Sequence, residues 1–227
     1  MIRLILSVIL LASHPVFAEE IVNKISVAGV GEIVTTPDIA TVRMGVTSQS
    51  DTARKAMDKS SKVIAEILNL LEAQGVGATD IQTSDLSLFP EFENRTPGKP
   101  PTTTGFRAQN LLSVTVRDLP NLGRILDLAG KAGGNVIQSI QFEKDDTKAL
   151  MDEARKKAIE NAIEKATLYA TSAGVNVGPV ITISEQTQHG TPLPIGMARA
   201  EAMVSAVPMA GGELTVRANV FVEFLIE

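Results

Sequence analysis

Few side chains in this chain of 227 residues could carry out acid–base or nucleophilic chemistry. There is no Cys, and there are two His, at positions 14 and 189. Ser-His-Asp catalysis needs an imidazole beside a positioned serine, and no Gly-x-Ser-x-Gly motif is present to hold one. Zinc needs three or four His, Cys or carboxylate ligands, and the two His are far apart in the sequence. We therefore predict no catalytic residue, no metal site and no bound cofactor.

Two short motifs have a structural explanation. Gly29-Val30-Gly31 resembles part of a phosphate loop, but no Lys-Ser/Thr follows it and the next segment has a strand pattern rather than a helical one. We interpret these glycines as relief of crowding at a strand. Asp145-Asp146 precedes a helical pattern, so helix capping accounts for both carboxylates.

The sequence allows three hypotheses about function, and an enzyme is the one with the least support. Carboxylates distant in the sequence can meet in any fold, and spacing along the chain would not reveal such a pair. A carboxylate- or Ser/Lys-based enzyme would need a cleft that gathers several of the residues Asp38, Asp85, Glu143 and Lys144.

Residues 1–18 have the pattern of a cleavable signal peptide. Arg3 precedes an apolar run over 4–11, and Val16 and Ala18 occupy the positions that signal peptidase requires before Glu19. The run is shorter than the roughly 20 residues of a spanning helix. We expect the mature chain, 19–227, to be periplasmic and to lack a membrane span. Loss of Arg3 changes the net charge from −5 to −6, so nucleic acid is not an expected partner.

Alternating and helical patterns along the mature chain predict an α+β fold. Helices are expected between Asp51 and Gly75, between Asp118 and Gly133, and from Asp145-Asp146 to about Ala173. Strands are expected over residues 24–34, 39–47, 81–89, 106–117, 136–142, 180–185 and 214–226.

The order of these elements suggests an internal duplication. Residues 39–117 and 136–227 both contain a strand, a long helix, a stopping glycine (Gly75 or Gly174), a strand, a long loop and a strand. We predict two β-α-β-β pseudo-repeats merged into one domain, with an antiparallel or mixed sheet and long helices packed on it. In the third helix, Ala recurs every four residues from 154 to 170, which favours close packing against the sheet.

Two long loops, 92–105 and 187–212, are candidate contact segments. The second is rich in adaptable apolar side chains. An exposed apolar loop in an exported protein indicates self-association or a partner, and a loop folded back over its own core is an equal alternative. The candidate contact residues are Ile195, Met197, Met203, Val204 and Met209.

Three blocks together resemble the SIMPL family, also called DUF541. They are 25–32 (ISVAGVGE) with Pro37-Asp38, 105–110 (GFRAQN) with 122–127 (LGRILD), and 153–158 (EARKKA) with 173–175 (AGV). The resemblance implies an α+β periplasmic or envelope protein, oligomeric in some members, linked to oxidative or envelope stress and immunogenic in some pathogens. No catalytic residues are established for the family, so none are carried over.

The leading hypothesis is therefore an exported, non-enzymatic homo-oligomer. The second hypothesis is a monomeric binding module for an envelope partner or a small ligand.

Overall fold

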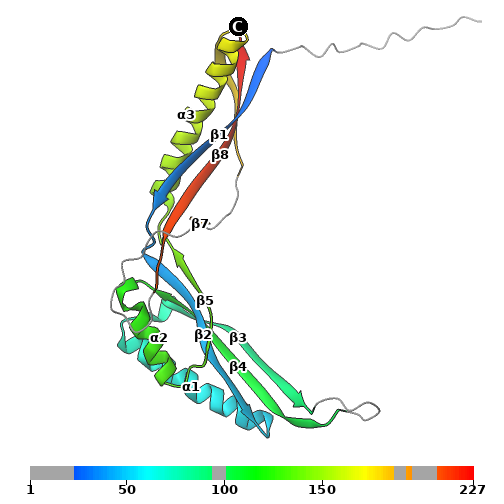
Figure 1. Cartoon of the computed structure of the whole chain (residues 1–227), viewed down its shortest axis with the longest axis vertical. Coiled ribbons are helices and arrows are strands. Elements are labelled where there is room, and N and C mark those ends of the chain that lie inside the picture. The colour runs from blue at the N-terminus through cyan, green and yellow to red at the C-terminus, as the bar shows by residue number, and fades with distance from the viewer. Residues whose placement is uncertain (1–22, 94–100, 187–192, 196–208) are drawn as a thin grey trace, which may run out of the picture.

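The computed structural model describes residues 23–93, 101–186, 193–195 and 209–227, which form two lobes. Each lobe is a β-sheet with helices on one face, and the lobes meet at an angle (Figure 1). Residues 1–18, which carry the predicted signal peptide, and the candidate contact residues Met197, Met203 and Val204 lie outside the described residues. We call the lobes upper and lower, as they stand in Figure 1.

The lower lobe has four antiparallel strands in the order β3-β4-β2-β5. Helices α1 (Ala53–Ala73) and α2 (Leu122–Lys131) cover one face, and the short helices η1 (Ala78–Asp80) and η2 (Leu119–Asn121) precede β3 and α2. Fully buried Val42, Ile67 and Val114 belong to the core between the sheet and the helices. The strands are β2 (Ile39–Ser50), β3 (Ile81–Phe92), β4 (Thr103–Val116) and β5 (Val136–Glu143).

The upper lobe joins the two ends of the described chain. Strand β1 (Lys24–Thr35) pairs along its length with the last strand, β8 (Glu213–Ile226), and β6 (Val177–Glu185) pairs with the other side of β8. A short strand, β7 (Leu193–Ile195), pairs with the start of β8. Helix α3 (Lys148–Ser172) lies over β1 and β8.

Helix α3 lies unusually close to the upper sheet because both surfaces carry small residues. A Cβ on Gly31 would overlap the carbonyl oxygen of Ala154, and one on Gly29 would overlap that of Ala158. This confirms that the two glycines relieve crowding at a strand. The five helical alanines at the contact are all buried: Ala154, Ala158, Ala162, Ala166 and Ala170.

The predicted strands and helices are all present, and the fold class is α+β as expected. Gly75 and Gly174 follow α1 and α3 with φ of 82° and 76°, the left-handed conformation that ends helices. The N-cap of α1 is Thr52 rather than Asp51: the Thr52 hydroxyl accepts a hydrogen bond from the Lys55 backbone N–H at 3.3 Å.

Strand pairing crosses the boundary between the two predicted repeats. Strand β5 opens the second repeat, yet it pairs with β2 in the lower sheet, and β1 occupies the place beside β8 in the upper sheet. Among the residues that the structure describes, the two hydrophobic cores share no buried residue. The duplication, and the grouping of both halves into one domain, stay predictions.

Candidate functional site

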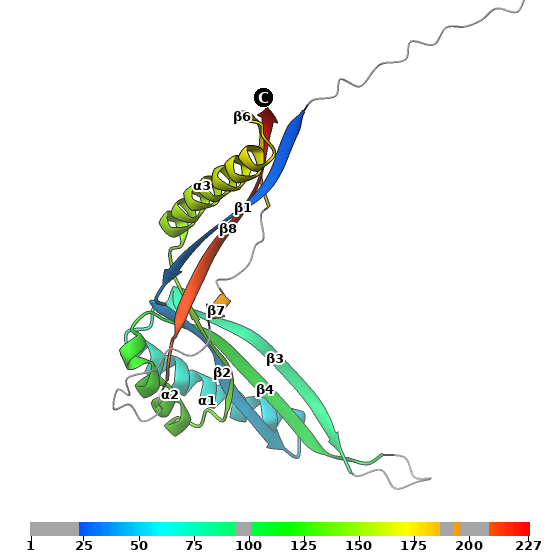
Figure 2. The same ribbon diagram turned by 45° about the horizontal axis from the view of Figure 1, so that its top comes forward.

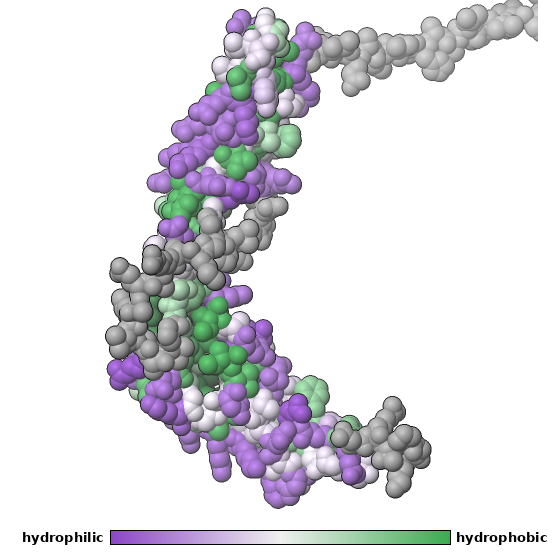
Figure 3. Space-filling view, in the orientation of Figure 1, coloured by the Kyte–Doolittle hydropathy of each residue, from purple (hydrophilic) through white to green (hydrophobic). Residues whose placement is uncertain are grey.

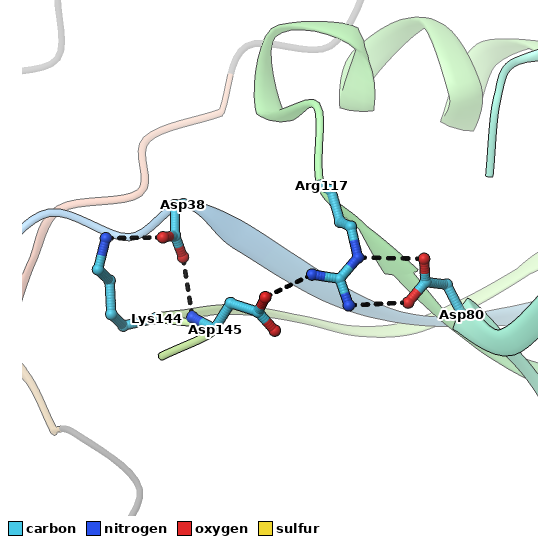
Figure 4. Close-up of polar contacts among 5 residues, drawn as sticks. All are labelled: Asp38, Asp80, Arg117, Lys144 and Asp145. Carbon is cyan, nitrogen blue, oxygen red and sulfur yellow. Dashed lines mark hydrogen bonds and ion pairs between the residues drawn. The ribbon is translucent and has the colours of Figure 1, made fainter. Parts of the chain in front are cut away.

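A cluster of Asp80, Arg117 and Asp145, which we call the polar junction, occupies the end of the lower sheet that faces the upper lobe (Figure 4). Arg117, one residue after β4, donates from Nε and Nη2 to the two carboxylate oxygens of Asp80, each at 3.1 Å. Its Nη1 donates to Asp145 at 2.6 Å. Hydrogen bonds from the two carboxylates raise the pKa of Arg117 further above its ordinary value, so the guanidinium stays charged. The Arg117 guanidinium, at the end of β4, thus connects the residues that precede β3 and α3.

This contact corrects the interpretation of Asp145 as a capping residue. Asp146 Oδ1 accepts a hydrogen bond from the Lys148 N–H at 2.8 Å, whereas the Asp145 carboxylate binds Arg117. The residue before α3 is Thr147, and its side chain makes no capping hydrogen bond.

Asp38 lies beside this cluster, between β1 and β2. Its Oδ2 accepts from Lys144 Nζ at 2.6 Å and its Oδ1 accepts from the Asp145 backbone N–H at 2.9 Å. The Lys144 hydrogen bond lowers the pKa of Asp38 below 3.8, and the backbone hydrogen bond adds to the effect. The carboxylate is therefore ionised near neutral pH. It connects the segment between β1 and β2 with the segment between β5 and α3.

The four residues of the enzyme hypothesis are only partly brought together. Asp38 and Lys144 form the ion pair just described, and Glu143 accepts a hydrogen bond from the Thr41 hydroxyl at 2.8 Å. Asp85 lies on β3, where it accepts a hydrogen bond from Ser87. Within the described ranges, no group of three or more His, Cys, Asp or Glu side chains could hold a metal ion.

The depressed pKa of Asp38 gives a testable pH dependence. Because the pKa is lower in the folded chain than the ordinary 3.8, the interaction stabilises the fold above that value and is lost as pH falls through the folded-state pKa. Asp38→Asn should therefore lower the midpoint of urea unfolding slightly at about pH 7 and have less effect at about pH 2.5. Lys144→Met should reproduce the loss at neutral pH. An equal effect of Asp38→Asn at both pH values would contradict this role.

The candidate contact residues within the described ranges lie next to the junction. Met209 is partly buried against the core of the lower lobe, and Ile195 lies in β7 opposite Glu213. Gly211 lies against Pro37 and Phe142, where an added Cβ would come within 2.9 Å of Pro37 Cγ and 3.3 Å of Phe142 Cδ1. The assignment of the whole loop to assembly stays a prediction.

A second candidate surface is the hairpin of β3 and β4, of which the sequence analysis identified only the loop 92–105 as a contact segment. We call its outer part, residues 86–92 and 103–108, the arm, because it extends beyond α1 (Figures 1 and 2). Four of its large apolar side chains are exposed: Leu86 by 55%, Leu88 by 40%, Phe89 by 56% and Phe92 by 54%. Leu86 and Leu88 lie opposite Asn110 and Ala108 on one face, whereas Phe89 lies opposite Arg107 on the other.

The charged groups of the arm are paired with each other. Arg107 donates to Glu91 at 2.8 Å from Nε and at 2.5 Å from Nη2, and Gln49 Nε2 donates to the same oxygen at 2.7 Å. The side chains left without a partner on the arm are therefore mainly apolar. Figure 3 shows further hydrophobic surface over the strands of the lower lobe, in contrast to the hydrophilic surface along α3.

These features define a two-lobed α+β protein with a polar junction and an exposed apolar arm. Among the described helices, none combines the length and the apolar character that crossing a bilayer requires. Residues 25–224 match the model of the SIMPL family, described as a protein of unknown function (DUF541), and the chain belongs to this family.

Relatives cover most of the chain. The 26 kDa periplasmic immunogenic protein of Brucella melitensis is 34% identical over 228 residues, which span 95% of this chain and 91% of the relative. The uncharacterized protein YggE of Escherichia coli K12 is 31% identical over 176 residues, which span 77% and 71%. YggE of Edwardsiella ictaluri is 31% identical over 167 residues, which span 74% and 70%. The resemblance recognised in the sequence is thus confirmed.

Proposed function

We propose that residues 19–227 form a non-enzymatic periplasmic protein that self-assembles into a homo-oligomer and serves in the response to oxidative or envelope stress. Export is supported by the pattern of the first eighteen residues and by the word periplasmic in the name of the Brucella relative. Self-assembly is supported above all by one observation, the exposed apolar side chains of the arm.

The arm concentrates aromatic surface in a chain that has little of it. Three of the six Phe after residue 18 are more than half exposed, and two of these, Phe89 and Phe92, lie on the arm. Full burial of a Phe side chain is worth about 1.5–3 kcal/mol, and aromatic residues are enriched at protein interfaces. Clustered exposed apolar side chains of this kind mark contact surfaces.

A second copy of the chain is the partner that best fits this surface. Because Arg107 and Glu91 satisfy each other, a partner needs apolar area rather than complementary charge. Another copy presents the same apolar area, so two arms can bury each other in an isologous contact. The apolar loop that contains Ile195, Met197, Met203, Val204 and Met209 is the second proposed contact segment.

The absence of Cys limits how a stress role could work. Without a thiol to oxidise, direct oxidation would act on methionines, such as Met197, Met203 and Met209 of the proposed contact loop. Sulfoxide formation would make these apolar side chains polar and would weaken an assembly contact made by the loop.

Replacing both arm aromatics tests the proposal. The double variant Phe89→Ser/Phe92→Ser should reduce the mass measured by light scattering, because it removes the two exposed Phe side chains of the arm. Phe221→Ser is the matched control, since Phe221 is exposed to a similar degree, 52%, but lies on β8 in the upper lobe. An unchanged oligomer mass in the double variant, with circular dichroism like that of the wild type, would exclude the arm as the contact.

The monomeric binding module remains the second candidate because the lower lobe has a small apolar pocket. Its volume is about 280 Å³, and its lining includes Met44, Ile67, Leu126, Ala129, Val136 and Ile137. A pocket of this size and lining suits a small apolar ligand rather than a charged one.

A further inference from the structure

The outer edges of the two sheets are not equally protected against pairing with another strand. An unpaired edge presents N–H and C=O groups to any available strand, and natural proteins guard such edges with prolines, bulges, charged side chains or a covering element. Edge β1 is covered by α3. Its Val30 N–H donates to Asn161 Oδ1 at 3.1 Å, and its Ala28 C=O accepts from Lys165 Nζ at 2.8 Å.

Strands β3 and β6 are guarded by prolines and irregular pairing. Pro90 lies within β3 and Pro179 within β6, and proline has no N–H to offer to an added strand. Each of these strands also has two register shifts against its neighbour. Bulges of this kind twist an edge away from regular pairing.

Strand β5 is guarded less than these strands, because it has only one register shift against its neighbour, between Arg43 and Met44 of β2. It contains no Pro and no Gly, and its first seven residues, 136–142 (VIQSIQF), are uncharged. It pairs with β2 on one side, and in the part of the chain that the structure describes no hydrogen bond reaches its outer edge from another strand or helix. Short uncharged segments of high β-propensity without proline pair readily with copies of themselves. Left open, this edge would be an aggregation site.

We propose that β5 of one copy pairs antiparallel with β5 of a second copy across a two-fold axis. This contact would join two four-stranded lower sheets into one continuous sheet. The inference rests on the proposed self-assembly and names one of its surfaces. Since β2 occupies one edge of β5, only the other edge is open in the described structure, and the contact closes at two copies.

The position of the one charged residue of β5 fits this antiparallel arrangement. Glu143, the only charged residue of the strand, lies at one end. A two-fold axis near the middle of the strand places Glu143 of each copy near Val136 of the other, so the carboxylates stay apart. Parallel pairing in register would instead place the two carboxylates side by side, which is unfavourable.

A matched pair of charge substitutions tests the contact. Gln141 on β5 and Gln82 on β3 are both exposed, on the face of the lower sheet away from α1 and α2, and on opposite edges. Gln141→Lys places two lysines near the proposed axis and should halve the mass measured by light scattering. Gln82→Lys makes the same chemical change on a guarded edge and should leave the mass unchanged. Equal effects of the two substitutions would overturn the proposal.

Cysteine cross-linking gives an independent readout. The chain has no Cys, so a single introduced thiol is the only one present. Residues directly opposite in an antiparallel pair have Cβ atoms about 4.5–5.5 Å apart, close enough for a disulfide after slight adjustment. At least one of Gln138→Cys, Ser139→Cys and Gln141→Cys should yield a covalent dimer under mild oxidation, and Gln82→Cys should not.

The outcomes separate this inference from the proposed function. If the wild type is oligomeric and none of the β5 cysteines cross-links, the β5 contact is wrong and self-assembly stands. If the wild type has the mass of a single subunit at every concentration, both are wrong, and the β5 edge is then free to accept an extended segment of another protein.

Discussion

Gly31→Ala should lower the free energy of unfolding by about 3 kcal/mol, because overpacking at a site that cannot relax costs about 1–3 kcal/mol or more. The added Cβ would overlap the Ala154 carbonyl oxygen and lie within 2.9 Å of the Lys157 Cβ. Both atoms belong to α3, and a helix cannot give way as a flexible side chain does. The measurement is urea unfolding followed by circular dichroism.

Gly130→Ala is the matched control for this prediction. Gly130 lies within α2, and an added Cβ there has no neighbouring atom within 4 Å in the described part of the chain. Alanine is favoured over glycine in a helix by about 1 kcal/mol, so this variant should be neutral or slightly more stable than the wild type. If the two substitutions had similar effects, the close contact between β1 and α3 would be disproved.

Ile67→Ala should destabilise the lower lobe by about 2–5 kcal/mol, the usual cost of emptying a buried site of this size. Ile67 is fully buried where α1 packs on the sheet, and it also lines the small pocket of this lobe. Its removal both loses apolar contact and enlarges an existing cavity. Urea unfolding measures the total loss of stability.

Hydrogen exchange should show where the loss from Ile67→Ala falls. Because none of the described buried residues belongs to both cores, the amides of β2 and β4 should lose protection, while those of β1 and β8 should keep most of theirs. An equal loss of protection in both sheets would mean that the lobes unfold as one cooperative unit.

Local sequence patterns predicted the helices and strands well, because the spacing of apolar residues differs between a helix and a strand. The alternation in β8 and the alanine repeat in α3 both correspond to buried faces. Strand partners are set by contacts between distant segments, so the placement of β5 beside β2 rather than beside β8 could not be deduced from its own sequence. For the same reason, the split into two sheets was not foreseen.

The candidate sites were harder to predict than the elements. Arg117 meets Asp80 and Asp145 across 37 and 28 residues, so no local motif marks the junction, and helix capping was a reasonable but wrong explanation for Asp145. The pattern of the arm predicted a strand, but its exposure depends on how far the helices extend over the sheet. A useful signal was present in Leu88 and Phe89, adjacent apolar residues on opposite faces of one strand.

The most direct test of self-assembly is light scattering on residues 19–227 over a wide range of protein concentration. The proposed function predicts a mass that is a multiple of the single subunit and that persists on dilution to the micromolar range. A single-subunit mass at every concentration would contradict self-assembly and would favour the monomeric binding module.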